Sequence, residues 1–174
     1  PPAMMLRVWR PSGDLLLEVG QDELRGLTAA ESHPVSALKK HLAGFCGQPR
    51  FRQRLLHSGR ILNEADALEV PMDLQLVIQP FAPASFEQMR SLKRAVCSND
   101  RLEVERILQR PQNPNLRIDV DENTLLHLAV TDSHIGILNL LLEARAYRNR
   151  MNVQGESPLL LATFSGDRDA VRSL

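Results

Sequence analysis

The chain has 174 residues, enough for one medium domain or two small ones, and its 43% hydrophobic content is sufficient for a buried core. Its 21 basic and 21 acidic residues cancel, overall and within each half, so we expect neither a nucleic-acid binder nor a membrane-surface binder. There is no apolar run of membrane-spanning length, no signal segment at the start, and no metal-ligand spacing around the two cysteines, so we expect a cytoplasmic or nuclear protein.

The first half has the apolar pattern of a small α+β domain. Two short apolar runs at 5–9 and 15–19 flank a turn sequence and predict a β-hairpin. Apolar residues then recur at helical spacing over 35–45, which predicts a helix with one buried face, ended by glycines 44 and 47. Strand-like segments follow at 54–57 and 74–78. The expected order is strand, strand, helix, strand, strand.

The pattern changes after residue 80. Residues 79–86 contain two prolines and no charge, which is typical of a linker. We therefore expect a first domain over 4–80, a linker over 81–86 and a second domain over 87–174.

The second half contains a repeated unit. Thr124–Ala129 recurs 33 residues later as Ser157–Ala162, and a degenerate copy, Leu92–Ala95, lies 34 residues earlier. Self-similarity at this period predicts stacked helical repeats. The apolar helical pattern is still running at Leu174, so we expect the last unit to be cut short and the chain to be a fragment of a longer protein.

The first half resembles ubiquitin and its relatives. The matching residues are Val35, Leu38, Lys39 and Leu42, then Gly47 and Pro49, then Gln53, Arg54, Leu55, Leu56 and Gly59, and finally Leu74, Leu76 and Val77. The resemblance implies a β-grasp fold. The sequence departs from the family in two places: it has additional residues between Val19 and the helix, and its loop from Leu68 to Leu74 is short. A third departure is the lack of a Gly-Gly terminus after the last strand, which implies a recognition surface and not a conjugated tag.

The second half resembles ankyrin repeats, with a capping unit at about 87–118, a central unit at 119–151 and a partial unit at 152–174. Thr124, Leu126, His127 and Ala129 open the best-matching unit. The resemblance implies an all-α stack that binds proteins. Arg145 stands where the family usually has glycine, which costs about 1 kcal/mol if the turn stays left-handed.

One candidate binding surface lies on the first domain. If Leu55, Leu74 and Leu76 point into the core, alternation places their strand neighbours on the opposite face. The candidate residues are Arg54, Leu56, Arg60, Gln75 and Val77. The resemblance implies recognition of this face by ubiquitin-binding modules or by the proteasome, with Leu56 and Val77 as anchors. The alternative is a face covered by the repeats or by Phe81.

A second candidate surface is the concave side of the repeats, which the resemblance implies is the partner-binding side. The positions are Asp121, Asn123, Thr131 and Asp132 in the central unit, and Gln154, Glu156, Phe164 and Ser165 in the next. Phe164 is the strongest candidate because an exposed aromatic offers a large contact area at a small entropic cost. The alternative is that Phe164 packs on a following inner helix. The acidic members favour a basic or polar ligand.

Catalytic and metal-binding patterns are missing from the sequence. There is no phosphate-binding glycine loop, no nucleophile elbow and no paired histidine motif. The resemblance gives His127 a bracing role between loops, and we interpret Cys46 and Cys97 as small packing residues. We therefore predict a protein that is not an enzyme and needs no cofactor.

These patterns together predict a non-catalytic scaffold or adaptor that binds other proteins, with ubiquitin signalling as a setting. One alternative is the regulatory N-terminal region of a ubiquitin ligase, deubiquitinase or kinase whose catalytic domain lies outside this sequence. Another is a nucleic-acid binder that uses the four arginines of the stretch 50–60.

Overall fold

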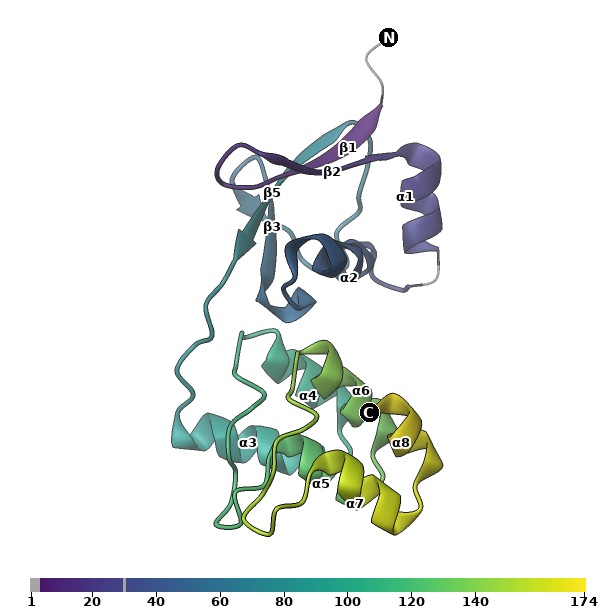
Figure 1. Ribbon diagram of the computed structural model, residues 1–174. Helices are drawn as coiled ribbons and strands as arrows, with labels where there is room; N and C mark the ends of the chain where they lie inside the picture. Colours follow the sequence, from purple (N-terminus) through teal and green to yellow (C-terminus); the bar gives the residue numbers. More distant parts are fainter. Residues whose placement is uncertain (1–3, 30) are drawn as a thin grey trace. The chain divides into compact units, whose positions relative to one another are not determined.

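The computed structural model describes residues 4–29 and 31–174 and divides into two units, one ending at Pro80 and the other beginning at Phe81. The first unit contains a mixed β-sheet with helices, and the second contains helices only (Figure 1).

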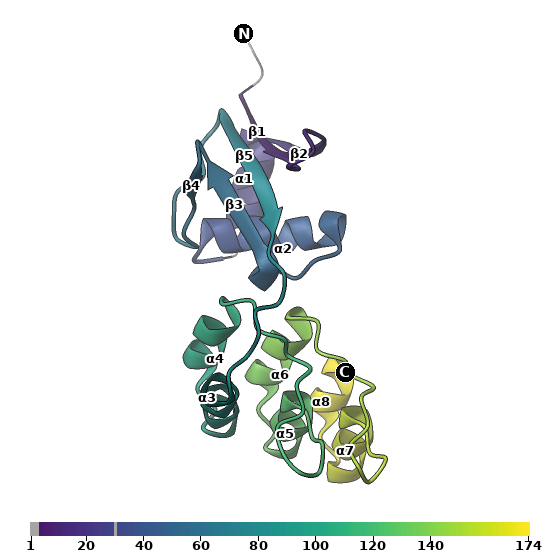
Figure 2. The same cartoon turned by 90° about the vertical axis from the view of Figure 1, so that its left-hand side faces the viewer.

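The sheet of the first unit has the strand order β2-β1-β5-β3-β4 (Figure 2). The central strands β1 and β5 are parallel, and the other neighbours pair antiparallel. The elements in chain order are β1 (Met5–Trp9), β2 (Leu15–Gly20), α1 (Gln21–Thr28), α2 (Pro34–Cys46), the 3-10 turn η1 (Arg50–Arg52), β3 (Gln53–His57), β4 (Arg60–Ile61) and β5 (Met72–Ile78).

The core of this unit lies between one face of the sheet and helix α2. Strand residues at every second position are buried, because alternate side chains point to the same face of a strand. They pack with helix residues spaced three or four apart. The main members are Leu6, Val8, Leu17, Val19, Leu55, Leu74 and Leu76 from the sheet, and Val35, Leu38 and Leu42 from α2. The predicted alternation of Leu55, Leu74 and Leu76 is confirmed.

Helix α1 was not predicted. It occupies the additional residues after Val19, and it buries Leu24 with Leu27 half-buried beside the same core. Two leucines three residues apart give too weak a period for a confident assignment from sequence. The end of α2 was predicted in part: Gly47 adopts a left-handed conformation with φ 66°, whereas Gly44 lies inside the helix.

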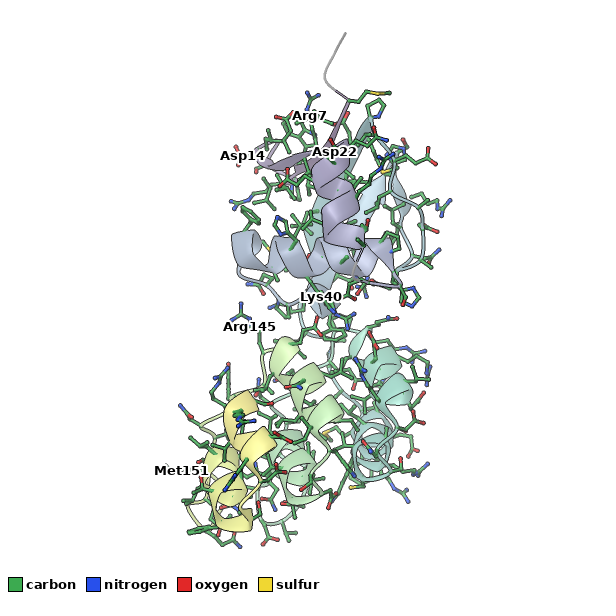
Figure 3. The ribbon with its side chains drawn as sticks, turned by 90° about the vertical axis from the view of Figure 1, so that its right-hand side faces the viewer. Arg7, Asp14, Asp22, Lys40, Arg145 and Met151 are labelled. Atoms are coloured by element: carbon green, nitrogen blue, oxygen red, sulfur yellow. The ribbon has the colours of Figure 1, made fainter. Side chains whose placement is uncertain are left out.

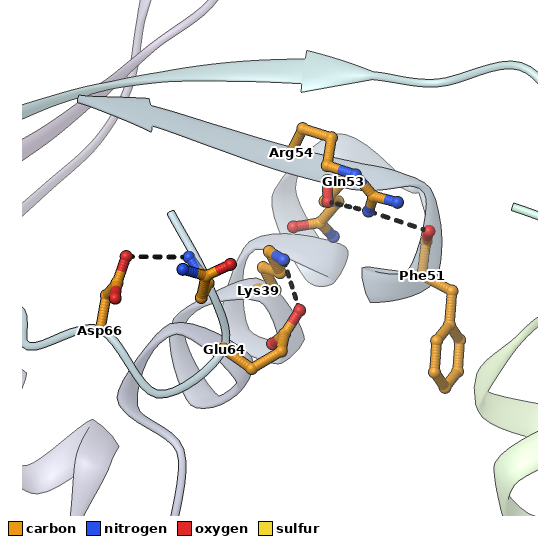
Figure 4. A network of polar contacts seen from close by, with 7 residues as sticks. Lys39, Phe51, Gln53, Arg54, Glu64 and Asp66 are labelled. Carbon is orange, nitrogen blue, oxygen red and sulfur yellow. Dashed lines mark hydrogen bonds and ion pairs between the residues drawn. The ribbon is translucent and has the colours of Figure 1, made fainter. Parts of the chain in front are cut away.

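A buried ion pair attaches the loop after β4 to α2 (Figure 4). The Lys39 side chain is only 2% exposed, and its Nζ lies 2.6 Å from Glu64 Oε1. The backbone N–H of Val35 donates to the carbonyl oxygen of Glu64 at 3.2 Å. Burial lowers the pKa of Lys39, and the hydrogen bond to Glu64 opposes that shift.

The second unit is built from three antiparallel helix pairs (Figure 1). The helices are α3 (Phe86–Cys97), α4 (Arg101–Leu108), α5 (Leu125–Thr131), α6 (Ile135–Glu143), α7 (Pro158–Ser165) and α8 (Arg168–Ser173). Helix α5 packs between α3 and α7, and α6 packs between α4 and α8. Each pair therefore buries its apolar face against its neighbours, as in a repeat stack.

Short polar side chains start several of these helices. Ser85 opens α3 with a reciprocal capping box, in which its hydroxyl accepts from Gln88 N and its own N–H donates to Gln88 Oε1. The carboxylates of Asp100 and Asp167 cap α4 and α8. Arg145, labelled in Figure 3, follows α6 with φ 67°, so the left-handed turn is retained without glycine.

Candidate binding surfaces

The sheet face opposite α2 carries the first candidate surface. Leu56 on β3 pairs with Gln75 on β5, and Arg54 pairs with Val77, so these four side chains share one face. Leu56 and Val77 are half-buried, and Gln75 is exposed. The structure therefore brings the predicted residues of the two strands together.

The two arginines of this surface are engaged within the unit. Arg54 Nη1 donates to the carbonyl oxygen of Gln53 at 3.0 Å, and burial lowers the pKa of its guanidinium (Figure 4). Arg60 forms an ion pair with Asp66 at 2.6 Å. Hydrogen bonds from the Asn63 backbone and from Arg60 hold the Asp66 pKa below its usual value. Neither arginine is a free cation at the rim of the patch.

Trp9 and Ile61 extend this surface and were missed by sequence reasoning. Trp9 pairs with Gln75 across β1 and β5, and its indole N–H donates to Asp73 Oδ1 at 3.1 Å. Ile61 on the edge strand β4 pairs with Leu56 on β3, and its side chain is 53% exposed. A hollow of about 330 Å³ is lined by Trp9, Leu56 and Gln75 among others.

A signal for Trp9 was present in the sequence. Leu6 and Val8 are buried, so alternation places Trp9 on the outer face of β1. The missing information was that β1 lies beside β5, which only the sheet order supplies.

Three of the four arginines in the stretch 50–60 make contacts within the first unit. Arg52 Nε donates to the Gln79 carbonyl oxygen, and its Nη1 donates to Gln48 Oε1, each at 2.7 Å. Arg54 and Arg60 are engaged as described above.

His127 braces neighbouring repeats, as predicted. The N–H of Thr124 donates to His127 Nδ1 at 3.0 Å, and His127 Nε2 lies 3.1 Å from the carbonyl oxygen of Glu156 in the next unit. These contacts require the tautomer with its proton on Nε2. Burial lowers the His127 pKa, and the hydrogen bond to Glu156 opposes that shift.

Two of the predicted concave residues also act in this bracing. Asn123 Nδ2 donates to Asp119 Oδ2, and Asn123 Oδ1 accepts from Asn152 Nδ2, both at 3.2 Å. Asn152 Nδ2 also donates to Glu156 Oε2 at 3.1 Å. Asn123 and Glu156 therefore stabilise adjacent hairpins, and Asn152, which sequence reasoning missed, links them.

The remaining predicted positions differ in what they offer a partner. Thr131 and Ser165 donate their hydroxyl hydrogens to carbonyl oxygens of their own helices. Phe164 is 73% exposed on α7. The side chains of Asp121, Asp132 and Gln154 are exposed as well. Among the eight predicted positions, Phe164 is thus the one large apolar side chain that is exposed.

The two cysteines have different surroundings. Cys46 is half-buried beside the core of the first unit. Cys97 is exposed at the end of α3, so its interpretation as a packing residue is wrong. The helical period gave no clear burial for Cys97 because it lies in the last turn of its helix.

Residues 4–29 and 31–174 contain neither a metal-binding cluster nor a membrane-spanning helix. No three His, Cys, Asp or Glu side chains gather there closely enough to hold a metal ion. Within the same ranges, no helix combines the length and apolar composition needed to cross a membrane.

Comparison with known proteins identifies the second unit. Residues 92–174 match the family model for ankyrin repeats in three copies. Two curated relatives from Pyricularia oryzae, one of them from strain 70-15, are each named Transcription factor SWI6 and are 32% identical over 118 residues. The match covers 62% of this chain and 13% of each relative, so the chain spans a small part of their length.

A solved structure is also similar. The crystal structure of the human ASB11 ankyrin repeat domain is 28% identical, with a TM-score of 0.43, and the match covers 47% of this chain and 36% of that one.

Proposed function

Because residues 92–174 are ankyrin repeats, a family that binds other proteins, we propose that this chain is a non-catalytic scaffold with two separate protein-binding surfaces. The first is the sheet face around Leu56 and Val77, and the second is the repeat surface around Phe164. The observation that carries the proposal is the exposure of Phe164 on a helix of the repeat stack. An aromatic side chain in that position is the kind of residue that dominates binding energy at interfaces.

The first unit is proposed to be a ubiquitin-like domain. The proposal is supported by the sheet order β2-β1-β5-β3-β4 with α2 against one face. It is also supported by the motif Gln53-Arg54-Leu55-Leu56, whose last residue lies on the outer face next to Gln75. The expected partners are ubiquitin-binding modules or proteasome components, which would place the scaffold in ubiquitin signalling.

Two tethered surfaces give a mechanism without chemistry. A protein held by one surface is presented at high effective concentration to a protein held by the other. The scaffold therefore acts by proximity, in the cytoplasm or the nucleus.

The test is quantitative affinity capture from cell extract with the chain and four single variants. Phe164→Ala should lose one group of captured proteins, whereas Tyr147→Ala, which removes another exposed aromatic of the second unit, should retain it. Leu56→Arg should lose a different group, and Phe45→Arg, at an exposed position of α2, serves as its control. Trp9 fluorescence and far-UV circular dichroism check folding. Retention of every captured protein by folded Phe164→Ala and Leu56→Arg would contradict the proposal.

A second candidate setting is transcription. Two relatives named Transcription factor SWI6 match this chain over 118 residues. In this setting the repeats would bind another transcription regulator, and the captured proteins would come mainly from the nuclear fraction. Capture restricted to cytoplasmic proteins would contradict this candidate.

A further inference from the structure

A hollow of about 580 Å³ lies beside the first helix of the repeat unit, and its lining contains none of the residues predicted for the two surfaces. One side is a stripe on α3 made by Phe86, Met89, Arg90 and Lys93, whose spacing places them on one helical face. The other side is the segment 117–120, which precedes α5. We refer to this site as the cap hollow.

At the cap hollow the first repeat departs from the others. Leu92-Lys93-Arg94-Ala95 corresponds to Leu126-His127-Leu128-Ala129, so Lys93 occupies the position of His127. His127 is buried and bonded to the next hairpin, as described above. Among the described residues, the Lys93 ammonium has no hydrogen bond or ion pair. The bracing contact is therefore replaced by a half-exposed cation facing open space.

In the described part of the chain, the charged side chains of the cap hollow that have no hydrogen-bond or ion-pair partner are positive. Arg90, like Lys93, has no carboxylate partner among the described residues, whereas Arg117 forms an ion pair with Glu122. The only acid in the lining, Asp119, accepts from the Asn123 backbone N–H at 2.9 Å and from its amide at 3.2 Å. A ligand entering this site therefore meets two available cations.

The cap hollow also offers apolar surface. Phe86 is 76% exposed and Val120 is 93% exposed, and they stand at its two sides. Burying exposed apolar surface contributes about 25 cal/mol per Å², so an occupant with an apolar side chain is favoured over a purely charged one.

We propose that the cap hollow binds an acidic peptide segment of a partner protein, with carboxylates on Arg90 and Lys93 and one aromatic or branched aliphatic side chain between Phe86 and Val120. The charge complementarity of the two free cations selects this occupant over a basic or neutral segment. The inference rests on the proposed function of the repeats as a protein-binding unit. It adds a second site to that unit, whose ligand is acidic, whereas the acidic concave residues favour a basic or polar ligand.

The experiment uses the full chain and three fluorescein-labelled peptides of about ten residues, measured by fluorescence anisotropy at about 50 mM salt, where ion pairs are weakly screened. The first peptide alternates Glu or Asp with Phe or Leu, the second has Gln or Asn in place of each acid, and the third has Lys. The acidic peptide should bind about tenfold more tightly than the amide peptide, since two exposed ion pairs together are worth this order.

The variants test the site and the sign of its charge. Arg90→Glu/Lys93→Glu should lose the acidic peptide and gain the Lys peptide, which a merely structural role would not produce. Arg94→Glu makes a similar charge change at an exposed position of the same helix, outside the lining, and should keep most of the acidic binding. Phe86→Ala should weaken the acidic and amide peptides alike.

Three outcomes would overturn the inference. The first is that the acidic peptide does not bind at protein concentrations up to about 1 mM, which corresponds to a binding free energy weaker than about −4 kcal/mol. The others are that the amide peptide binds as tightly as the acidic one, or that Arg94→Glu loses as much acidic-peptide binding as Arg90→Glu/Lys93→Glu. If proteins that depend on Phe164 are still captured, such an outcome rejects the cap hollow alone. If Phe164→Ala also loses nothing, the proposed function is rejected with it.

Discussion

The two units are stabilised over different distances along the chain. In the first unit, β1 and β5, the first and last strands along the chain, pair with each other, and the Trp9 indole N–H donates to Asp73, 64 residues away. In the second unit, the polar contacts of His127 with Glu156 and of Asn123 with Asn152 join neighbouring repeats. Damage to the first unit should therefore affect all of it, whereas damage to the second should act through nearest neighbours.

The largest expected effect is on the centre of the sheet. Leu74→Ala removes a side chain that is 1% exposed on β5. It should lower the free energy of unfolding of the first unit by about 3–4 kcal/mol, through lost burial and a residual cavity. Urea unfolding followed by fluorescence reports this unit, because Trp9 is the only tryptophan of the chain.

The matched control is Leu15→Ala at a position of β2 that is 46% exposed, where the loss should stay below about 1 kcal/mol. Equal losses in the two variants would show that the sheet core does not hold this unit together.

The buried ion pair gives the next effect. Glu64→Gln leaves the Lys39 ammonium buried without its carboxylate, and it should cost about 2 kcal/mol, below the value for a fully buried pair because Glu64 is 22% exposed. The double variant Lys39→Met/Glu64→Leu should recover most of the loss, since apolar replacements of buried pairs are often neutral. A double variant as unstable as Glu64→Gln would show that the loop needs the charge itself.

This contrast in distance also explains what sequence reasoning could predict. The inward position of Leu55 and the outward position of Leu56 follow from strand alternation, and the role of His127 follows from its repeat motif. The first is a property of one strand, and the second follows from the repeat motif. The pairing of Lys39 with Glu64, and of Trp9 with Gln75, follows from no strand or repeat period and depends on how the whole first unit folds.

The same argument applies to the candidate surfaces. Phe164 was chosen as a candidate from the resemblance to the repeats, with packing on a following helix left open, and its side chain is 73% exposed. The engagement of Arg54 and Arg60 was not predictable, because their partners are a nearby carbonyl oxygen and a loop carboxylate whose directions depend on backbone geometry. The exposure of Cys97 was missed for a related reason, since burial in the last helical turn is set by the neighbouring helices.

The bracing histidine predicts a pH effect in the second unit. The folded His127 pKa is lowered, so the neutral form is favoured by folding and its contribution is fully present above the unfolded value of about 6.5. As the pH falls below that value, the unfolded state gains a proton that the folded state does not. Stability should fall by about 1 kcal/mol between about pH 7.5 and about pH 5.5.

Urea unfolding followed by far-UV circular dichroism at the two pH values measures this change. His127→Asn should lower the stability at both pH values and abolish this part of the pH dependence. His134→Asn changes another histidine of the same unit and should retain it. An unchanged pH dependence in His127→Asn would assign the effect to other groups.

The smallest expected change in the free energy of unfolding is at the turn after α6. Substitutions there distinguish the stabilising contact between neighbouring repeats from the backbone strain of the turn. Arg145 has φ 67°, and its carbonyl oxygen accepts from Asn115 Nδ2 at 3.3 Å, so the previous repeat helps to hold the left-handed turn. Arg145→Gly should raise stability by about 0.5–1 kcal/mol, because glycine adopts this conformation without a Cβ clash. Arg145→Ala keeps the Cβ and should give no gain, so equal stability of the two variants in urea unfolding would locate the effect in the arginine side chain instead of the backbone.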